Sequence, residues 1–202
     1  MAAQNVEQNT GRRASRKSLV QELLETVLLT ALLFGVAKFS VQNFQVDGMS
    51  MDPTLQNNEM ILVDKVSYHF HNGLPSRGDI IVFHAPLTTG QFGKDFIKRV
   101  IALPGDVVTI KPINNVNRVF VDHKMLNESY ILERMRTTDL PNCIDPRGCT
   151  TIVPPHDVFV MGDNRNNSYD SRAWGPLAQS AIIGRALIAY WPLSHLSLLT
   201  NR

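Results

Sequence analysis

Apolar residues along the 202-residue sequence form one long block near the N-terminus and then a series of short ones. The long block is Leu19–Val41, and its charge-free centre, Thr26–Ala37, has no strongly polar face. The charged residues of the block, Glu22, Glu25 and Lys38, lie toward its ends, where side chains reach the membrane interface at low cost. Because about 20 apolar residues span a bilayer, the block predicts a transmembrane helix rather than a soluble amphipathic one.

The residues before this block are polar and carry four basic side chains close to it, Arg12, Arg13, Arg16 and Lys17. Positive charge beside a transmembrane helix stays on the cytoplasmic side. We therefore expect a cytoplasmic N-terminus, with everything after the helix on the far side of the membrane. A cleaved signal peptide is the alternative: the small residues of Gly35–Ala37 weakly match a cleavage site, but Glu22 and Glu25 are unusual in such a segment.

Beyond the long block the sequence changes to short runs rich in Val, Ile and Phe, separated by Gly, Pro, Asn and Asp. The runs are Met60–Val66, Asp79–Ala85, Phe96–Leu103, Asp106–Ile110, Val119–Asp122 and Asp157–Asp163. Each has the length of a strand and a turn signal close by, a spacing typical of an antiparallel sandwich or barrel. A further segment, Gln179–Ala189, fits a short helix or a strand. We therefore expect a mainly β protein: a basic tail (1–17), one N-terminal transmembrane helix (18–42) and an antiparallel β-sandwich or barrel-like domain (43–202).

Composition excludes several classes of protein. With 44% hydrophobic and 19% charged residues, the chain is not disordered. A net charge of +2 without a basic stripe argues against nucleic-acid binding. Two cysteines are too few for a zinc site or a disulfide framework, so we expect no metal and no cofactor. Beyond the membrane, Cys143 and Cys149 are placed to form one disulfide across a short loop, with two free thiols as the alternative.

A serine in a constrained turn follows the long block. Ser50 stands between two methionines, with Gly48 before it and Pro53 after it, so part of the backbone is fixed. Such a serine is most often a cap or an exposed hydroxyl, and its usual base as a nucleophile is histidine. No histidine segment has an orienting carboxylate except that of His156, whose neighbour Asp157 points the other way in a strand. The sequence also lacks a G-x-S-x-G turn, so a Ser-His-Asp hydrolase is disfavoured.

Lysine replaces histidine as a base when burial lowers its pKa toward neutrality. In the run that contains Lys98, strand alternation places Phe96, Lys98 and Val100 on one face. The ammonium group then lies between two large apolar side chains, which favours loss of its proton. Lys98 is therefore a candidate general base, and an ordinary surface lysine is the alternative.

A third polar cluster, Gly162–Gly175, lies between a predicted strand and a Trp-Gly stop. It combines Asp, Asn, Arg, Ser and Tyr side chains. Such a mixture predicts a structured loop held by its own hydrogen bonds rather than a merely hydrophilic one. Within it, Asp170 and Arg172 are spaced to pair and to orient a neighbouring hydroxyl.

Together these segments resemble the type I (leader) signal peptidases, the membrane-anchored serine endopeptidases with a Ser/Lys dyad. The resemblance covers almost the whole chain, from the anchor through Trp191. Four segments carry it, in the family's order: Gly48–Leu55, Arg77–Phe83, Lys98–Asp106 and Gly162–Arg172. They look like the nucleophile box, the strand box that follows it, the general-base box and the C-terminal box. One box is a weak signal, but four in order behind an anchor are specific.

The resemblance implies a role for each matching residue. Ser50 is the nucleophile and Lys98 the general base. Ser168 hydrogen-bonds and positions Lys98, while Asp170 and Arg172 brace the loop that carries Ser168. The backbone N–H of Ser50 forms part of the oxyanion hole.

Two positions depart from the family's pattern. Some members have a serine two residues before the nucleophile, whose hydroxyl is a second oxyanion-hole donor. This chain has Gly48 there, so a backbone group or water takes that part. Asn166 stands where Asp is common, which weakens charge pairing in the loop but touches no implied catalytic role.

The implied reaction begins when neutral Lys98 takes the proton of Ser50, whose oxygen attacks the scissile carbonyl to form an acyl-enzyme. The implied substrates are secretory precursors with small residues, typically Ala, at the first and third positions before the cut. Shallow apolar pockets would read those residues. Because Ser50 follows Val41 by about nine residues, roughly 30 Å of extended chain at most separates it from the membrane, which suits substrates held in the lipid bilayer.

The implied location is the plasma membrane, crossed once, with the catalytic domain outside; a thylakoid membrane is the alternative. Two other functions compete. One is a self-cleaving Ser/Lys regulator, which would be cytosolic and DNA-linked, whereas this sequence has an anchor and no basic recognition helix. The other is a catalytically silent, membrane-anchored β-domain that binds exported partners, which the full set of chemical residues argues against.

Overall fold

The computed structural model describes residues 18–70, 73–136 and 148–199. The predicted basic tail over residues 1–17 lies outside the described residues, as does Cys143. The chain divides into two compact units, one formed by most of the N-terminal helix and one that begins at Phe39.

Helix α1 (Leu19–Ser40) carries its charged residues toward its ends and is apolar on all sides at its centre, and none of its residues is buried. Its 22 residues correspond to about 33 Å, close to the roughly 30 Å of a bilayer's hydrocarbon core. The hydroxyls of Thr26 and Thr30 donate to the backbone carbonyls four residues earlier, at 2.8 Å each, so neither donor needs water. By length and composition, this helix is able to cross a membrane.

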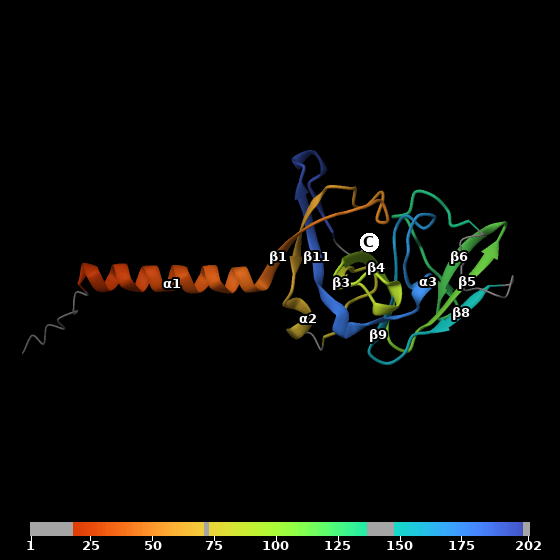
Figure 1. The fold of residues 1–202 in the computed structure, drawn as a ribbon, viewed down its shortest axis with the longest axis horizontal. Helices are drawn as coiled ribbons and strands as arrows, with labels where there is room; N and C mark the ends of the chain where they lie inside the picture. The colour runs from red at the N-terminus through yellow and green to blue at the C-terminus, as the bar shows by residue number, and fades with distance from the viewer. Residues whose placement is uncertain (1–17, 71–72, 137–147, 200–202) are drawn as a thin grey trace, which may run out of the picture. The chain divides into compact units, whose positions relative to one another are not determined.

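The main sheet of the β domain contains eight strands: β1 (Val41–Gln45), β2 (Met60–Asp64), β3 (Ile80–His84), β4 (Asp95–Ala102), β9 (Asp157–Met161), β10 (Leu177–Ala178), β11 (Ile182–Trp191) and β12 (Ser197–Leu198). Their order is β1-β2-β11-β3-β4-β9-β10, with β12 paired to β11, and every pair is antiparallel (Figure 1). Strand β1 begins directly after the helix because all five of its residues pair with β2. The helix therefore ends at Ser40, two residues before the boundary expected from the sequence.

A second sheet contains four strands: β5 (Val107–Ile113), β6 (Val116–Val121), β7 (Lys124–Met125) and β8 (Cys149–Ile152). Their order is β7-β6-β5-β8, again antiparallel, and Figure 1 shows β5, β6 and β8 grouped beside the main sheet. One-turn helices α2 (Ser67–Phe70) and α3 (Ser171–Trp174) lie in the connections. The mainly antiparallel β fold with one N-terminal apolar helix is confirmed, and most of the ambiguous segment Gln179–Ala189 is strand β11.

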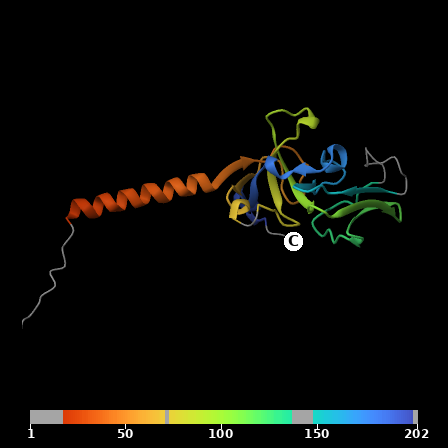
Figure 2. The ribbon, with the colours of Figure 1, turned by 90° about the horizontal axis from the view of Figure 1, so that it is seen from below.

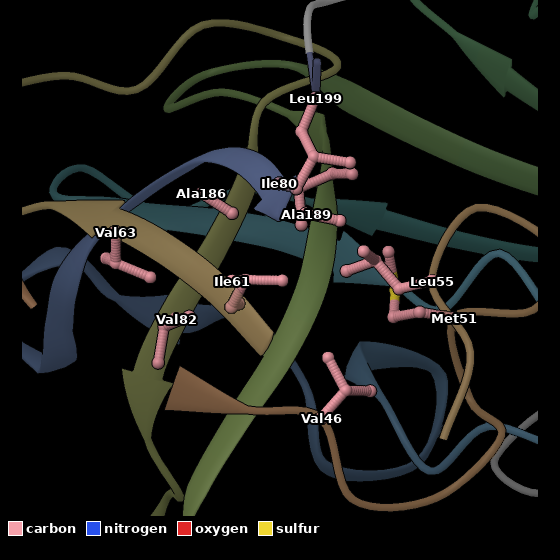
Figure 3. Close-up of a cluster of buried hydrophobic side chains, with 10 residues drawn as sticks. All are labelled: Val46, Met51, Leu55, Ile61, Val63, Ile80, Val82, Ala186, Ala189 and Leu199. Atoms are coloured by element: carbon pink, nitrogen blue, oxygen red, sulfur yellow. The ribbon is translucent and has the colours of Figure 1, made fainter. Parts of the chain in front are cut away.

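A buried hydrophobic cluster includes Met51 and Leu55, which follow Ser50 in the chain (Figure 3). Three of its side chains, Val46, Met51 and Leu55, come from the chain between β1 and β2, and the others come from β2, β3, β11 and the C-terminal end. Met51, the residue after Ser50, is completely buried. Packing of Met51 therefore fixes the backbone beside Ser50, whose own side chain stays half-exposed.

The connection between β3 and β4 stands clear of the rest of the β domain (Figure 2). It includes a short 3₁₀ turn, Leu87–Thr89, and leads into the first residues of β4. Asp95–Ile97 pairs with β3 on one side, whereas pairing with β9 on the other side begins only at Arg99. The start of β4 thus has one open edge.

Candidate active site

The turn that carries Ser50 is held at several points. The N–H of Gly48, whose φ of +95° favours glycine, donates to the side chain of Asn57 at 2.8 Å. The N–H of Asp52 donates to the carbonyl of Met49 at 3.2 Å. Together with the buried Met51, these contacts present the Ser50 hydroxyl in a fixed position.

Strand β4 brings Lys98 to this hydroxyl. Lys98 Nζ donates to Ser50 Oγ at 2.7 Å and to the carbonyl of Ile97 at 2.8 Å. Lys98 pairs with Ile81 of β3, and this register fixes the position of Lys98 in the sheet. Its side chain is buried, with 5% of its surface exposed, and Nζ lies 5.5 Å from the centre of the Phe96 ring.

Burial lowers the pKa of Lys98 from the ordinary 10.5 to about 8. The negative charges of Asp170 and Asp163 act in the opposite direction, and the positive charge of Arg172 adds to the lowering. A lysine with this pKa is neutral in an appreciable fraction of molecules near neutral pH, so it is able to accept a proton from the hydroxyl that it contacts.

A buried ion pair lies in the C-terminal loop. Asp170 accepts hydrogen bonds from Arg172 Nε at 2.8 Å, from Arg172 Nη2 at 2.7 Å and from the N–H of Gly162 at 3.0 Å. Burial by itself raises the pKa of the Asp170 carboxyl, but Arg172 and the Gly162 N–H outweigh it, and the pKa is lowered. Arg172 also donates to the carbonyls of Arg165 and Ser168, at 2.6 and 3.3 Å. The pair therefore fixes the course of the loop.

Ser168 reaches the site without a hydrogen bond to Lys98. Its hydroxyl is buried and interacts with the Asp170 carboxylate, whose pKa it helps to lower, and within the described ranges Lys98 Nζ bonds to Ser50 and Ile97 instead. A side chain at Gly162 would overlap both the Ser168 hydroxyl and the Ser50 carbonyl, so glycine at this position lets the two serines approach. The structure thus brings Ser50, Lys98 and Ser168 together, but the expected bond between Ser168 and Lys98 is not formed.

A second buried ion pair joins β4 to the same loop, and it was not predicted from the sequence. Arg99 Nε and Nη2 donate to the two carboxylate oxygens of Asp163 at 2.8 and 2.7 Å, and both side chains are almost completely buried. The hydroxyl of Thr54 donates to Asp163 at 2.5 Å. Asp163 therefore links the strand of Lys98 to the segment that follows Ser50. The signal in the sequence is Arg99 itself: it stands in the mainly apolar second half of β4, and a buried arginine requires a carboxylate partner.

Two asparagines of the loop have different partners. Asn164 donates from its backbone and its side chain to the carbonyls on either side of the Ser50 α-carbon. Asn166, the second departure from the family pattern, points elsewhere: it accepts from the N–H of Arg136 at 3.0 Å and donates to Glu133 at 3.1 Å.

A pocket of about 240 Å³ opens beside Ser50 and Lys98. Most of its wall is apolar and comes from β1 and the residues after it, from Ile61 and Val82, and from the first half of β4. Tyr169, which is half-exposed, lines it from the C-terminal loop. Among the strands that the structure describes, none pairs with the outer edge of β1 or with one edge of the start of β4, so an extended peptide has main-chain partners there.

Other chemistry finds little support in the described residues. The histidine rings whose contacts are described bond elsewhere, His84 to Asp95 and His195 to Glu59, and neither reaches Ser50. Within the described ranges, no three His, Cys, Asp or Glu side chains gather closely enough to hold a metal ion. The predicted disulfide includes Cys143, which lies outside those ranges, so that bond stays a prediction.

The sequence matches known proteins over most of its length. The family model for signal peptidase, peptidase S26, matches residues 19–191. A probable signal peptidase I-1 of Synechocystis is 44% identical over 176 residues, which cover 85% of this chain and 81% of that protein. The signal peptidase I of Leptolyngbya laminosa is 38% identical, covering 89% and 83%. Signal peptidase IB of Staphylococcus aureus is 34% identical, covering 89% and 93%.

A solved structure of a signal peptidase I from Enterococcus faecalis is 26% identical and gives a TM-score of 0.39, covering 55% of this chain and 96% of that one. The family assignment rests on the sequence matches. They leave no support for a catalytically silent domain or a self-cleaving regulator. The chain therefore belongs to the type I signal peptidases of peptidase family S26, the membrane-anchored serine endopeptidases that act on secretory precursors.

Proposed function

We propose that the chain removes N-terminal signal peptides through a Ser/Lys dyad, with Ser50 as nucleophile and Lys98 as general base. The observation that carries the proposal is the 2.7 Å hydrogen bond between Lys98 Nζ and Ser50 Oγ, made by a lysine whose pKa burial lowers to about 8. Among the described residues, no other basic side chain contacts the Ser50 hydroxyl.

The reaction proceeds in two steps. Neutral Lys98 takes the hydroxyl proton while Ser50 Oγ bonds to the scissile carbonyl carbon. The resulting oxyanion collapses, the peptide C–N bond breaks, and the proton passes from Lys98 to the leaving amine, which leaves an acyl-enzyme. Lys98 then takes a proton from water as the water attacks the ester, and Ser50 is released with its proton restored. No group outside the chain, the substrate and water is needed.

The remaining site residues position this pair. Ser168 and Gly162 lie against the turn that carries Ser50, and the buried Asp170–Arg172 pair holds their loop. The backbone N–H of Ser50 is the oxyanion-hole donor, because within the described residues it has no other acceptor. Gly48 has no hydroxyl and its N–H is already bonded to Asn57, so another backbone group or water is the second donor.

The pocket beside Ser50 selects substrates that have small residues, typically Ala, at the first and third positions before the cut. It must receive the substrate's main chain as well as two side chains within about 240 Å³. Its apolar wall favours methyl groups, and its limited size excludes long side chains.

Replacing Ser50 with alanine is expected to lower kcat/KM by a factor of at least roughly 10³, because the nucleophile is lost while the pocket remains. The measurement is cleavage of a purified secretory precursor with an Ala-x-Ala site by the detergent-solubilised chain. Exposed Ser180, changed to alanine, is the matched control and should cleave normally. A precursor with leucine in place of both alanines should resist cleavage. Cleavage at the same site by Ser50→Ala would exclude Ser50 as the nucleophile.

We further propose that residues 1–17 are cytoplasmic, that α1 is the transmembrane anchor and that the catalytic domain lies outside the plasma membrane. The basic cluster before α1 and the membrane-held substrates support this arrangement. Protease added to intact spheroplasts should digest the β domain and leave an N-terminal epitope tag protected. A β domain that resists digestion until the cells are lysed would contradict this topology and would agree with placement in an internal membrane such as a thylakoid.

A further inference from the structure

We infer that Asn164 is a positioning residue for the oxyanion hole, because it fixes the peptide group whose N–H comes from Ser50. The inference rests on the proposed role of Ser50 as nucleophile. It gives Asn164 a function that neither the family boxes nor the Ser/Lys pair assigns to it.

Asn164 makes hydrogen bonds to the peptide groups on both sides of the Ser50 α-carbon. Its side-chain Nδ2 donates to the carbonyl of Met49 at 3.0 Å, and its backbone N–H donates to the carbonyl of Ser50 at 3.1 Å. One residue of the C-terminal loop thereby holds both peptide planes that define the orientation of Ser50.

The bond to Met49 determines where the Ser50 N–H points. The carbonyl of Met49 and the N–H of Ser50 belong to the same peptide group, which is planar and trans, so the two point in opposite directions. With the carbonyl held by Asn164, the N–H points away from the loop and, among the described residues, has no acceptor. A hydrogen bond to the carbonyl oxygen also polarises the peptide group, which strengthens the N–H as a donor.

Asn164 itself is firmly placed. The preceding residue, Asp163, makes two hydrogen bonds to the buried guanidinium of Arg99. The N–H of Asp52 also reaches the Met49 carbonyl, at 3.2 Å, but it belongs to the same turn and would move with it. Asn164 is therefore the link between this peptide group and the rigid part of the site.

The side chain must be a donor for this role. Aspartate has nearly the shape of asparagine, but its ionised carboxylate only accepts hydrogen bonds and would face the Met49 carbonyl oxygen. Asn164→Asp thus removes the bond and repels the carbonyl, whereas Asn164→Ala only removes the bond. The matched control is Asn166→Asp, the same chemical change two residues away, at a side chain whose bonds go to Arg136, Glu133 and Arg134 instead.

The test compares these variants in the detergent-solubilised full chain. Asn164→Asp should lower kcat about 10- to 100-fold, somewhat less than outright removal of an oxyanion-hole donor, while KM changes less than about threefold. Affinity for a peptide aldehyde ending in alanine, which forms a tetrahedral adduct with Ser50, should fall by the same factor as kcat/KM. Affinity for the corresponding peptide alcohol should not change, and in the uncharged variant Asn164→Ala the apparent pKa of the pH–rate profile should not change either. Asn166→Asp should behave as the unmodified chain.

Three results would overturn the inference: a kcat of Asn164→Asp equal to that of Asn166→Asp, an equal loss of affinity for aldehyde and alcohol, or a shifted pKa in Asn164→Ala, which would mean that Asn164 acts through Lys98. If Asn164→Asp does not fold, Asn164→Ala takes its place, and normal kcat in that variant would overturn the inference too. Failure of the proposed function is distinguishable, because Ser50→Ala would then still cleave. If Ser50→Ala is inactive and both Asn164 variants are normal, only the role of Asn164 is wrong.

Discussion

Replacing Lys98 with methionine is expected to abolish cleavage and to raise the midpoint of thermal unfolding at pH 7. Methionine fills similar space but accepts no proton, so kcat/KM should fall by a factor of roughly 10³ or more. Stability should rise because the buried ammonium is costly. A pKa lowered from 10.5 to about 8 corresponds to a penalty on the order of 3 kcal/mol on the folded state.

The sign of the pH dependence follows from the lowered pKa. Below pH 8 the lysine is protonated in both the folded and the unfolded chain, so the whole penalty is present. Between about pH 8 and pH 10.5 the folded chain releases the proton first, and the penalty disappears as pH rises. The stability gained by Lys98→Met should therefore be large at pH 7 and shrink toward pH 10. Lys94→Met, which changes an exposed lysine just before the same strand, is the control and should change stability little at either pH.

Activity should follow the neutral form of the same lysine. In the unmodified chain kcat/KM should rise with pH to a plateau, with an apparent pKa of about 8. About a tenth of the molecules are then competent at pH 7 and about nine tenths at pH 9. Lys98→Arg should be inactive at every pH, because guanidinium does not deprotonate. A flat profile from pH 5 to pH 10, or substantial activity of Lys98→Arg, would remove Lys98 from the mechanism.

Replacing Asp163 with asparagine should cost about 3–5 kcal/mol of the free energy of unfolding, because it leaves the buried guanidinium of Arg99 without a counter-charge. Both side chains of this pair have 3% or less of their surface exposed, so water does not compensate. The hydroxyl of Thr54 loses a charged acceptor in the same change. Denaturant-induced unfolding in detergent measures the loss.

A surface ion pair provides the comparison. Asp122 contacts Arg77 at 3.2 Å, and both side chains are more than 40% exposed, so Asp122→Asn should lower the free energy of unfolding far less than Asp163→Asn does. Changing Arg99 to leucine together with Asp163→Leu removes both charges and should recover much of the lost stability. Equal losses for Asp163→Asn and Asp122→Asn would mean that the buried pair does not stabilise the junction between β4 and the loop.

The strands that the sequence predicts best are those whose apolar residues are close together. Met60–Val66 and Asp79–Ala85 contain strands β2 and β3 because each buries a compact hydrophobic run. Strand β1 was not expected, because its sequence VQNFQ has little apolar character and exposes three of five residues. Strand β1 forms because it pairs with β2, and the residues of β1 alone do not predict this pairing.

The site was predictable in its parts and not in its connections. Ser50 and Lys98 stand out only when the four boxes are considered together, since a turn serine and a strand lysine are ordinary by themselves. The hydrogen bonds that position these two residues join parts of the chain that are far apart in the sequence. Arg99 and Asp163 are 64 residues apart, and Asn164 and Met49 are 115 residues apart. Pairings over such distances depend on the assembled sheet, so residue type and spacing do not reveal them.

The direct passage from helix α1 to strand β1 has a consequence for how the enzyme selects proteins. Only a few residues of chain separate the end of the helix at Ser40 from Phe44, which already lines the pocket. A long flexible linker would allow the catalytic centre to occupy a large volume, which would lower its effective concentration at the membrane. Because such a linker is missing, the enzyme diffuses within the plane of the membrane and encounters precursors in the same bilayer at a high effective concentration. Residence in the membrane thus adds selectivity beyond what the pocket beside Ser50 supplies.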